Sequence, residues 1–319
     1  MSAHLGRCDA EGMTAVIDVQ HLHKAYGDTV AVDDISFSVA EGEIFGILGP
    51  NGAGKTTTVE CIEGLRAPDR GTITVLGLDP RRDRAELTQR LGAQLQDSRL
   101  PDRLRVAEAL ELYSSFYRTP ADWRELMELL GLADKQRTMF GQLSGGQQQR
   151  LSIALALVGS PQVAVLDELT TGLDPQARRD TWELIEGVRA RGVTIVLVTH
   201  FMEEAERLCD RVALIDAGRV VAVDTPAGLA EGLQAGQRIQ FRPSVPLDDA
   251  LLTGLPEVSS VIHRGDVVVV TGNDNALNAV TSALARNQIV ARQLRVEQAS
   301  LEDAFVALTG HHHDNNDRS

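Results

Sequence analysis

The sequence predicts an α/β protein in which a phosphate-binding loop joins a buried strand to a helix. The stretch Gly49 to Thr56 (GPNGAGKT) matches every fixed position of the pattern G-x-x-x-x-G-K-[ST]. Apolar residues 44–48 precede it and residues 57–62 continue as the first turns of a helix. A further helix is expected from 81 to 91. Further apolar strands followed by helices are expected at 163–168 and 193–198.

The loop has the residue types that phosphate binding requires. Glycines let the backbone curl without Cβ clashes, so that its N–H groups point inward and form an anion site with the helix N-terminus. Lys55 can then reach the β- and γ-phosphates, and the Thr56 hydroxyl can bind Mg²⁺. The predicted nucleotide site consists of Gly49, Pro50, Asn51, Gly52, Ala53, Gly54, Lys55, Thr56 and Thr57.

Composition excludes several other classes of protein. The 319 residues carry a formal net charge of −14, which argues against sequence-independent binding of nucleic acid. No apolar run approaches the roughly 18 residues that span a bilayer, and the N-terminus lacks an apolar signal core. We therefore expect a cytosolic protein, or one held at a membrane by a partner. Three scattered cysteines argue against a zinc site, and Cys61 is expected in the core.

Two regions interrupt the α/β pattern of the first domain. Short β-like runs at 15–19, 30–32 and 35–39 predict an antiparallel section ahead of the loop. Tyr26 in this section either stacks on an adenine base or packs on the sheet, and the residue type fits both. The region from about 97 to 160 has helical periodicity and is expected to be an inserted helical subdomain.

Polar residues at expected strand and helix ends are the other site candidates. Asp167 and Glu168 end an apolar strand, where they can hold Mg²⁺ through water and orient an attacking water. His200 follows another apolar strand and can donate a hydrogen bond to a phosphate. Ser144 is expected to cap a helix whose first N–H groups form a second anion site, unless this is only a capped helix with glycines at its start. This last stretch is Ser144, Gly145, Gly146 and Gln147.

Taken together, these motifs resemble the ATP-binding cassette (ABC) ATPases, the nucleotide-binding subunits of transporters. The resemblance covers about residues 16–229 and includes the order of the motifs. Leu-Ser-Gly-Gly-Gln at 143–147, just ahead of the apolar strand that ends in Asp-Glu, is close to diagnostic. It implies a P-loop ATPase fold, a mixed sheet with an antiparallel β subdomain, and hydrolysis of ATP to ADP and phosphate.

The resemblance also implies a role for each candidate. Tyr26 is similar to the aromatic residue that stacks on adenine. Thr56 and Gln96 resemble Mg²⁺ ligands, with Asp167 holding the ion through water; Gln96 is preferred to Gln94 for its distance from the preceding strand. Glu168 resembles the catalytic base and His200 the sensor of the γ-phosphate. Ser144 to Gln147 resemble the loop that completes the site of the opposing subunit, which Asp174 contacts.

These roles imply a head-to-tail homodimer that closes on ATP and drives a separate membrane permease at the cytoplasmic face of the membrane. A soluble ABC ATPase acting on ribosomes or nucleic acid is the alternative. A regulatory module that no longer hydrolyses ATP is disfavoured by the presence of Lys55, Asp167, Glu168 and His200 together. The chain departs from the family at Leu169, where proline is common and would stiffen the loop.

The remaining sequence predicts a second, smaller domain. Residues 1–14 are expected to be a disordered tail and 15–232 the ATPase domain. Residues 233–310 are expected to form a small α+β accessory domain without a catalytic cluster, and 311–319 a second tail, in which three histidines either bind a metal or stay solvated. The ending Ser300 to Phe305 with Leu308-Thr309-Gly310 resembles exporter ATPases of the drug and polysaccharide type.

Overall fold

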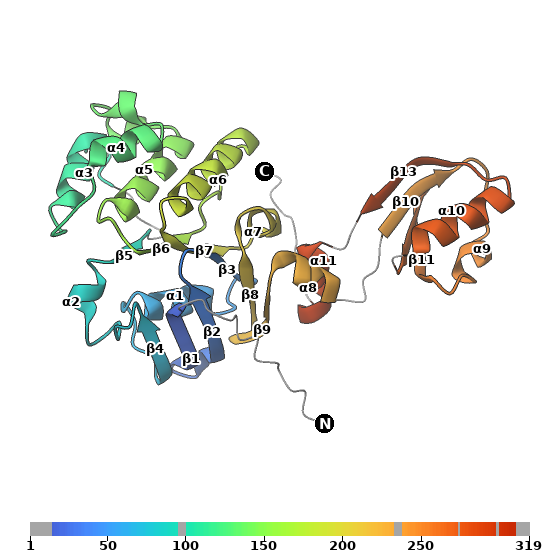
Figure 1. Ribbon diagram of the computed structural model, residues 1–319, viewed down its shortest axis with the longest axis horizontal. Coiled ribbons are helices and arrows are strands. Elements are labelled where there is room, and N and C mark those ends of the chain that lie inside the picture. The colour runs from blue at the N-terminus through green and yellow to red at the C-terminus, as the bar shows by residue number, and fades with distance from the viewer. Residues whose placement is uncertain (1–14, 95–99, 233–237, 274, 298–299, 311–319) are drawn as a thin grey trace. The chain divides into compact units, whose positions relative to one another are not determined.

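The computed structural model describes residues 15–94, 100–232, 238–273, 275–297 and 300–310. The predicted tails, Gln96 and the histidines at 311–313 lie outside these residues. The chain divides into two compact units between Val223 and Asp224 (Figure 1). Neither unit contains a helix long and apolar enough to cross a membrane, as far as the described residues extend.

The first unit is built on a nine-stranded mixed sheet. Strands β1, β2 and β4 form its antiparallel end, whereas β8, β3, β7, β6 and β5 run parallel. In sheet order the strands are β4 (Arg70–Val75), β1 (Ala15–Tyr26), β2 (Thr29–Ala40), β9 (Arg219–Asp224), β8 (Arg211–Asp216), β3 (Ile44–Leu48), β7 (Thr194–Thr199), β6 (Val163–Asp167) and β5 (Leu91–Ala93).

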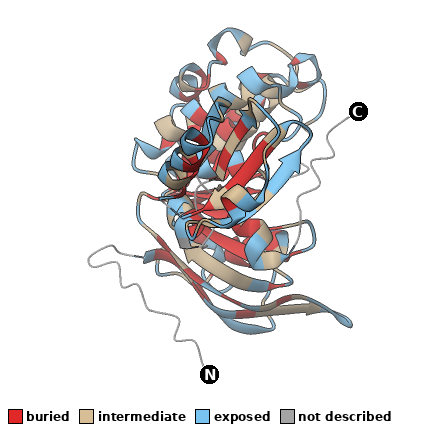
Figure 2. Cartoon of the chain, turned by 90° about the vertical axis from the view of Figure 1, so that its right-hand side faces the viewer, coloured by how far each residue is buried: buried red, intermediate tan, exposed pale blue. Residues whose placement is uncertain are grey.

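The central strands explain why the site lies where it does. Every residue of β3, β6 and β7 is buried, as the sequence's unbroken apolar runs predict for parallel strands covered on both faces (Figure 2). These strands are neighbours in the order β3-β7-β6, so their carboxyl ends meet at one edge. Ligand sites of open α/β sheets form at that edge.

Helices connect and flank the strands. They are α1 (Lys55–Ile62), α2 (Arg84–Leu87), α3 (Val106–Ser114), α4 (Trp123–Leu129), α5 (Gly145–Leu157), α6 (Pro175–Arg189) and α7 (Met202–Leu208). Figure 1 shows α3, α4 and α5 gathered on the side away from β1, β2 and β4, and residues 100–162 contribute no strand to either sheet. The structure thus confirms the inserted helical subdomain.

Two predicted elements differ from the structure. The β-like runs at 30–32 and 35–39 form one strand, β2, because the acids between them are not buried and find partners on neighbouring strands: Asp34 contacts His21 Nδ1 at 3.0 Å and Asp33 pairs with Arg219. The helix expected from 81 to 91 is only the single turn of α2, since Asp79 and Asp83 hold the preceding residues in a turn of side chain to backbone hydrogen bonds.

The second unit is a small α+β structure, as predicted. An antiparallel sheet in the order β11-β12-β10-β13 packs Phe241, Val268 and Val270 against Val280 and Leu284 of α10. Ser300 caps the last helix with a capping box, in which its side chain accepts the Asp303 N–H. The elements are α8 (Pro226–Gly232), β10 (Arg238–Pro243), α9 (Ala250–Thr253), β11 (Val258–Arg264), β12 (Val267–Gly272), α10 (Ala276–Arg286), β13 (Ala291–Glu297) and α11 (Leu301–Thr309).

The unit boundary precedes the one that the sequence predicts. The second compact unit of the structure begins at Asp224, whereas the sequence pattern predicts that the first domain ends at residue 232. The difference is α8, which the sequence assigns to the first domain but which contacts α11 in the second unit.

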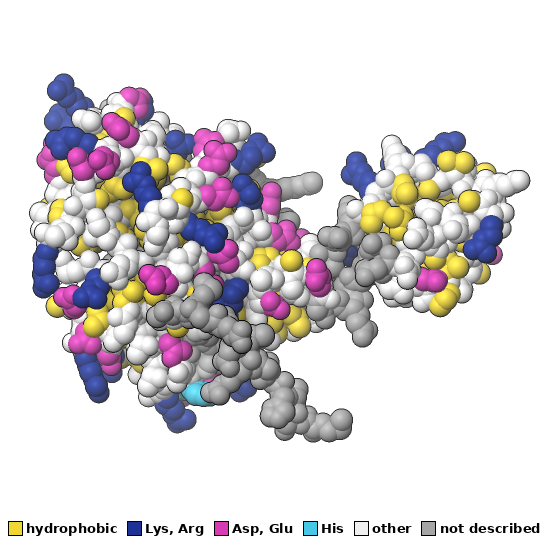
Figure 3. Space-filling model, viewed as in Figure 1, with side chains coloured by type: hydrophobic (Ala, Val, Ile, Leu, Met, Phe, Trp, Pro, Cys, Tyr) yellow, Lys and Arg dark blue, Asp and Glu magenta, His cyan; other side chains and the backbone are white. Residues whose placement is uncertain are grey.

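Charged side chains of both signs are interspersed over the face of the first unit drawn in Figure 3.

Candidate nucleotide site

The phosphate loop lies between β3 and α1, as predicted, and two of its glycines are required by close backbone contacts. A Cβ on Gly49 would lie 2.1 Å from the Ile215 carbonyl oxygen. Gly54 has a φ of 99°, and a Cβ there would lie 2.4 Å from the Ala31 carbonyl oxygen. Any side chain at either position would displace β8 or β2, so these glycines fix how tightly the loop packs against the sheet.

Lys55 points back into the loop. Its Nζ donates to the carbonyl oxygens of Gly49 at 2.8 Å and Pro50 at 3.0 Å. Burial lowers the pKa of the ammonium, while the nearby carboxylates of Glu168 and Asp167 oppose the decrease. The positive charge is therefore held inside the loop between backbone oxygens, where an entering phosphate can take over these contacts.

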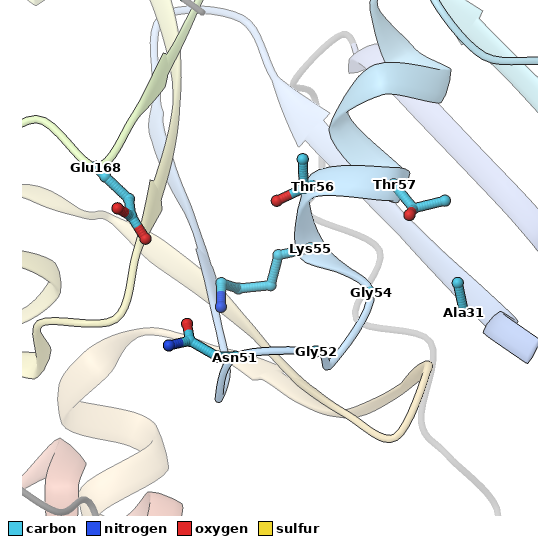
Figure 4. A pocket seen from close by; sticks show the side chains of 8 residues that line it. All are labelled: Ala31, Asn51, Gly52, Gly54, Lys55, Thr56, Thr57 and Glu168. Atoms are coloured by element: carbon cyan, nitrogen blue, oxygen red, sulfur yellow. The ribbon is translucent and has the colours of Figure 1, made fainter. Parts of the chain in front are cut away.

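The loop forms one wall of a pocket of about 400 Å³. Glu168 lies across it from Lys55 and Thr56 (Figure 4). Of the lining residues only Ala31 was not predicted; its small side chain lies on β2 beside Gly54, and no sequence signal distinguishes it. The pocket is lined by Ala31, Asn51, Gly52, Gly54, Lys55, Thr56, Thr57 and Glu168.

The acidic pair and the histidine meet at the adjacent ends of β6 and β7. Asp167 is buried at the end of β6 and Glu168 is half-buried just beyond it. His200 follows β7, and its Nδ1 lies 3.4 Å from Glu168 Oε1, at an angle unsuited to a hydrogen bond. The structure thus brings together the phosphate loop, Glu168 and His200 from three neighbouring strands.

Glu168 holds an unusual backbone conformation. Its φ is 49°, in the left-handed region that side-chain-bearing residues seldom adopt, and its N–H donates to the Val198 carbonyl of β7 at 2.9 Å. The next residue, Leu169, is fully buried. A residue that precedes proline is pushed toward extended conformations, so leucine at 169 favours this backbone at Glu168 more than proline would.

Leu169→Pro is expected to lower kcat about tenfold while the affinity for ATP changes little. The change drives Glu168 out of its left-handed conformation and moves its carboxylate relative to His200. Steady-state ATP hydrolysis and equilibrium binding of a fluorescent ATP analogue measure the two effects separately. Leu169→Met, which keeps the buried volume, is the matched control. Equal kcat for the proline and methionine variants would show that the backbone at Glu168 does not limit turnover.

Glu63 is a buried acid near the site that the sequence did not single out. It follows α1 and is 7% exposed, and burial, with added repulsion from Asp167 and Glu60, raises its pKa to about 8. The carboxyl is therefore protonated at neutral pH in the folded chain. Its position at a helix end looks like a solvated acid in the sequence, and only the packing reveals the burial.

This pKa predicts a pH-dependent stability. Between the ordinary value of 4.5 and about 8, the folded chain keeps the Glu63 proton and the unfolded chain loses it, so the free energy of unfolding falls as pH rises through this window. In urea unfolding without nucleotide, Glu63→Gln should gain on the wild type by on the order of 1 kcal/mol per pH unit between pH 5 and 8. Exposed Glu183→Gln is the control, and parallel curves for Glu63→Gln and wild type would contradict the assignment.

The remaining predicted residues lie outside the pocket lining. Ser144 caps α5 with a capping box, in which Gln147 Oε1 accepts from the Ser144 N–H at 3.0 Å. Asp174 caps α6 by accepting the N–H groups of Gln176 and Ala177, both at 3.0 Å, and these bonds lower its pKa. Both residues thus have a helix-capping role inside the chain, and contacts with another subunit stay a prediction.

The structure describes Tyr26 and Gln94, two of the predicted or considered site residues, but not Gln96. Tyr26 lies at the end of β1, 39% exposed, with the charges of Lys24 and Arg66 over its ring at 5.6 and 5.5 Å. It therefore does not pack into the sheet core, and its ring is accessible to a base. Gln96 lies outside the described residues, whereas Gln94 is buried at the end of β5, and its Oε1 has no hydrogen-bond partner in the described chain.

The donors present suit Mg²⁺ better than a metal held by protein alone. No group of three or more His, Cys, Asp or Glu side chains that could hold a metal occurs in the described part of the chain. Mg²⁺ keeps several waters and is bound through one or two protein oxygens together with substrate phosphates. The Thr56 hydroxyl in the pocket and the Asp167 carboxylate beside Lys55 are oxygens of that kind.

This fold and site define a P-loop ATPase whose phosphate loop faces Glu168 across the pocket, with His200 beside that carboxylate. The ABC transporter domain matches residues 32–171. The Nod factor export ATP-binding protein I of Burkholderia pseudomallei is 46% identical over 93% of this chain and 97% of that protein. Its counterpart in Mesorhizobium japonicum is 38% identical over 93% of this chain and 87% of that protein.

Solved structures agree. The cbiO1 protein of Clostridium perfringens, part of the transporter complex cbiONQ, is 28% identical with a TM-score of 0.62, covering 67% of this chain and 90% of that one. A dimeric ATP-binding cassette bound to ADP and Pi after hydrolysis is 27% identical with a TM-score of 0.59, covering 66% of this chain and 98% of that one. The chain belongs to the ATP-binding subunits of ABC transporters, and it is an ATPase.

These comparisons confirm the resemblance that the sequence motifs indicate and the fold class that they predict. The relatives reported are transport proteins, and none of them favours the alternative of an ABC ATPase that acts on ribosomes or nucleic acid.

Proposed function

We propose that this chain is the ATPase subunit of an exporter and powers a permease carried by a separate chain at the cytoplasmic face of a membrane. The observation that carries the proposal is full-length similarity to proteins named for export. The matches to them extend over 93% of the chain and so include part of the second unit. The phosphate loop supplies the energy source, and the permease supplies the path through the membrane.

Hydrolysis at the proposed site follows from the positions of its side chains. The loop N–H groups and Lys55 bind the β- and γ-phosphates, and Lys55 exchanges its backbone oxygens for phosphate oxygens. Glu168, across the pocket, accepts a hydrogen bond from the attacking water and orients it toward the γ-phosphorus. His200, beside Glu168, donates a hydrogen bond to the γ-phosphate and so senses its presence.

Mg²⁺ would be held by the Thr56 hydroxyl and by Gln96, with Asp167 binding it through water. When bound, the ion neutralises charge on the phosphates. Asp167 ends a strand that is buried throughout, so the sheet restricts the movement of its backbone. Its carboxylate would therefore reach the ion from a fixed position.

We infer that a second copy of the chain completes the pocket. The N-terminus of α5 is exposed at Ser144 and Gly145, and its first N–H groups have no partner within the helix. We infer a two-fold dimer in which these N–H groups of one subunit bind the γ-phosphate held by the loop of the other. Tyr26 would stack on the adenine, and Asp174 would lie at the interface.

Mixing two inactive variants tests this arrangement. Lys55→Ala disables the loop, and Gly145→Asp places a negative charge where the phosphate would bind. The latter change is mild for the fold, since a Cβ at Gly145 meets nothing within 4 Å and an acid suits a helix N-terminus. Each variant alone should be inactive, whereas a mixed dimer contains one intact site, so activity should return on mixing. Gly145→Ser is the control without charge.

Absence of recovery, with mixed dimers shown to form by crosslinking, would overturn the shared site. The permease assignment has its own test, which is purification of the chain from native membranes followed by identification of the membrane protein that accompanies it. Recovery of the chain without any membrane protein would contradict the exporter proposal.

A further inference from the structure

A buried polar cluster lies behind the strand ends that carry Glu168 and His200. Its centre is Glu204 of α7, which is fully buried. Trp182 of α6 donates its Nε1 hydrogen to Glu204 Oε1 at 3.3 Å. No basic side chain in the described chain lies within ion-pair distance of this carboxyl. Burying a carboxyl without an ion-pair partner is costly unless hydrogen bonds stabilise it. The groups that surround the Glu204 carboxyl therefore indicate its role.

Two of these neighbours belong to the loops that carry the site. Thr199 ends β7 and directly precedes His200, and its Oγ1 accepts the Phe201 N–H at 3.0 Å. Thr170 lies two residues after Glu168 and is fully buried. Burial raises the pKa of Glu204, and the nearby hydroxyls of Thr199 and Thr170, together with the Trp182 N–H, oppose the increase. The carboxyl therefore lies close to both loops.

One contact of this cluster is not fully formed. Glu204 Oε2 and Thr170 Oγ1 are both buried, and neither has a partner in hydrogen-bond geometry among the described residues. Leaving such atoms unpaired is costly, and a small movement of the loop after β6 would pair them with each other. The same loop holds Glu168 in its left-handed conformation, which persists only where the surroundings enforce it.

We propose that Glu204 is a positioning residue for ATP hydrolysis, which joins the loop after β6 through Thr170 to the loop after β7 through Thr199 and so sets Glu168 against His200. The inference rests on the roles proposed above for those two residues. Arg178 on α6 and Cys209 at the end of α7 are the other titratable groups that face the Glu204 carboxyl, and neither lines the phosphate pocket.

Substitutions at Glu204 separate positioning from packing. Glu204→Leu removes the polar contacts, and kcat should fall about tenfold or more while KM for ATP stays within about twofold, because the phosphate loop is untouched. Glu204→Gln keeps the size of the side chain and an oxygen that can accept from Trp182, so its kcat should stay within about threefold of the wild type. Exposed Glu203→Gln on the same helix is the control for loss of an acidic group.

A double-mutant cycle tests the link itself. Thr170→Val removes the hydroxyl and keeps the shape, and on the proposal the double variant Thr170→Val with Glu204→Leu should lose no more activity than Glu204→Leu alone. Thr170→Val also keeps the test open if Glu204→Leu does not fold, because it should itself lower kcat with unchanged KM. Additive losses in the cycle, or an unchanged kcat in Thr170→Val, would overturn the proposal.

The outcome is distinguishable from failure of the proposed function. If Glu168→Gln hydrolyses ATP normally, the catalytic assignment fails and Glu204 has nothing to position. If Glu168→Gln is inactive while Glu204→Leu keeps the wild-type kcat, the assignment stands and only the role of Glu204 is wrong. A fall in kcat, ATP affinity and melting temperature together in both Glu204→Leu and Glu204→Gln would indicate a purely structural residue.

Discussion

Glu168→Gln is expected to lower ATP turnover by about 100-fold or more, with ATP still bound. The amide keeps the size of the carboxylate, so the pocket across from Lys55 retains its shape, but it no longer accepts a proton or a strong hydrogen bond from the attacking water. Because binding persists without hydrolysis, the closed dimer should accumulate when ATP is added. Phosphate release measures the first effect and gel filtration with ATP the second.

The matched control for this change is Glu41→Gln. Glu41 is exposed just ahead of β3, at the end of the strand opposite the pocket, and its substitution removes the same charge at a distance from the site. It should leave turnover and assembly unchanged. Normal steady-state hydrolysis by Glu168→Gln would remove Glu168 from the mechanism and leave His200 or the loop itself to orient the water.

Lys55→Ala is expected to weaken ATP binding by about 10- to 100-fold, the equivalent of losing one charged hydrogen-bonded contact. The ammonium is buried in the loop and is held there by the Gly49 and Pro50 carbonyl oxygens. Lys55 is also the one basic residue among the described residues that line the pocket, so its removal leaves no positive side chain there to bind the phosphates. Equilibrium titration with labelled ATP at fixed ionic strength measures the loss directly.

Lys135→Ala is the control for loss of a lysine. Lys135 lies in the helical insertion, where it pairs with Asp134 and does not line the pocket. Its substitution should leave the affinity for ATP unchanged. An affinity in Lys55→Ala equal to that of the wild type would mean that the loop N–H groups bind the phosphates without help from the lysine.

Much of the site is readable in the sequence because its chemistry needs fixed residues at fixed spacing. A tight loop around phosphate requires Gly49, Gly54 and Lys55. In the structure both glycines pack so closely against backbone oxygens that no side chain would fit, so the packing of the fold requires glycine at these two positions as well. The apolar runs of β3, β6 and β7 are equally plain, since strands buried on both faces are apolar throughout except at their ends.

Other features depend on residues that are distant in the sequence. The 3.4 Å approach of His200 to Glu168 follows from the strand order β3-β7-β6, which no local pattern specifies. The burial of Glu63 and Glu204 is likewise hidden, because an acid on a short helix has the same sequence appearance whether water or another helix covers it. The assignment of α8 to the second unit depends on α11, about 70 residues later, as expected of contacts between non-adjacent segments.

The sequence by itself therefore determined the class of protein, the phosphate loop, the central strands of the first unit and the α+β character of the second. These rest on local requirements of backbone geometry, hydrophobic periodicity and phosphate chemistry, and a local requirement leaves its mark in adjacent residues. Only the tertiary structure decided which acids are buried, which loop ends meet, and that Glu168 is held in a left-handed conformation between β6 and β7. Those properties arise from the environment that the rest of the fold creates around each side chain, and the same residue can occupy many environments.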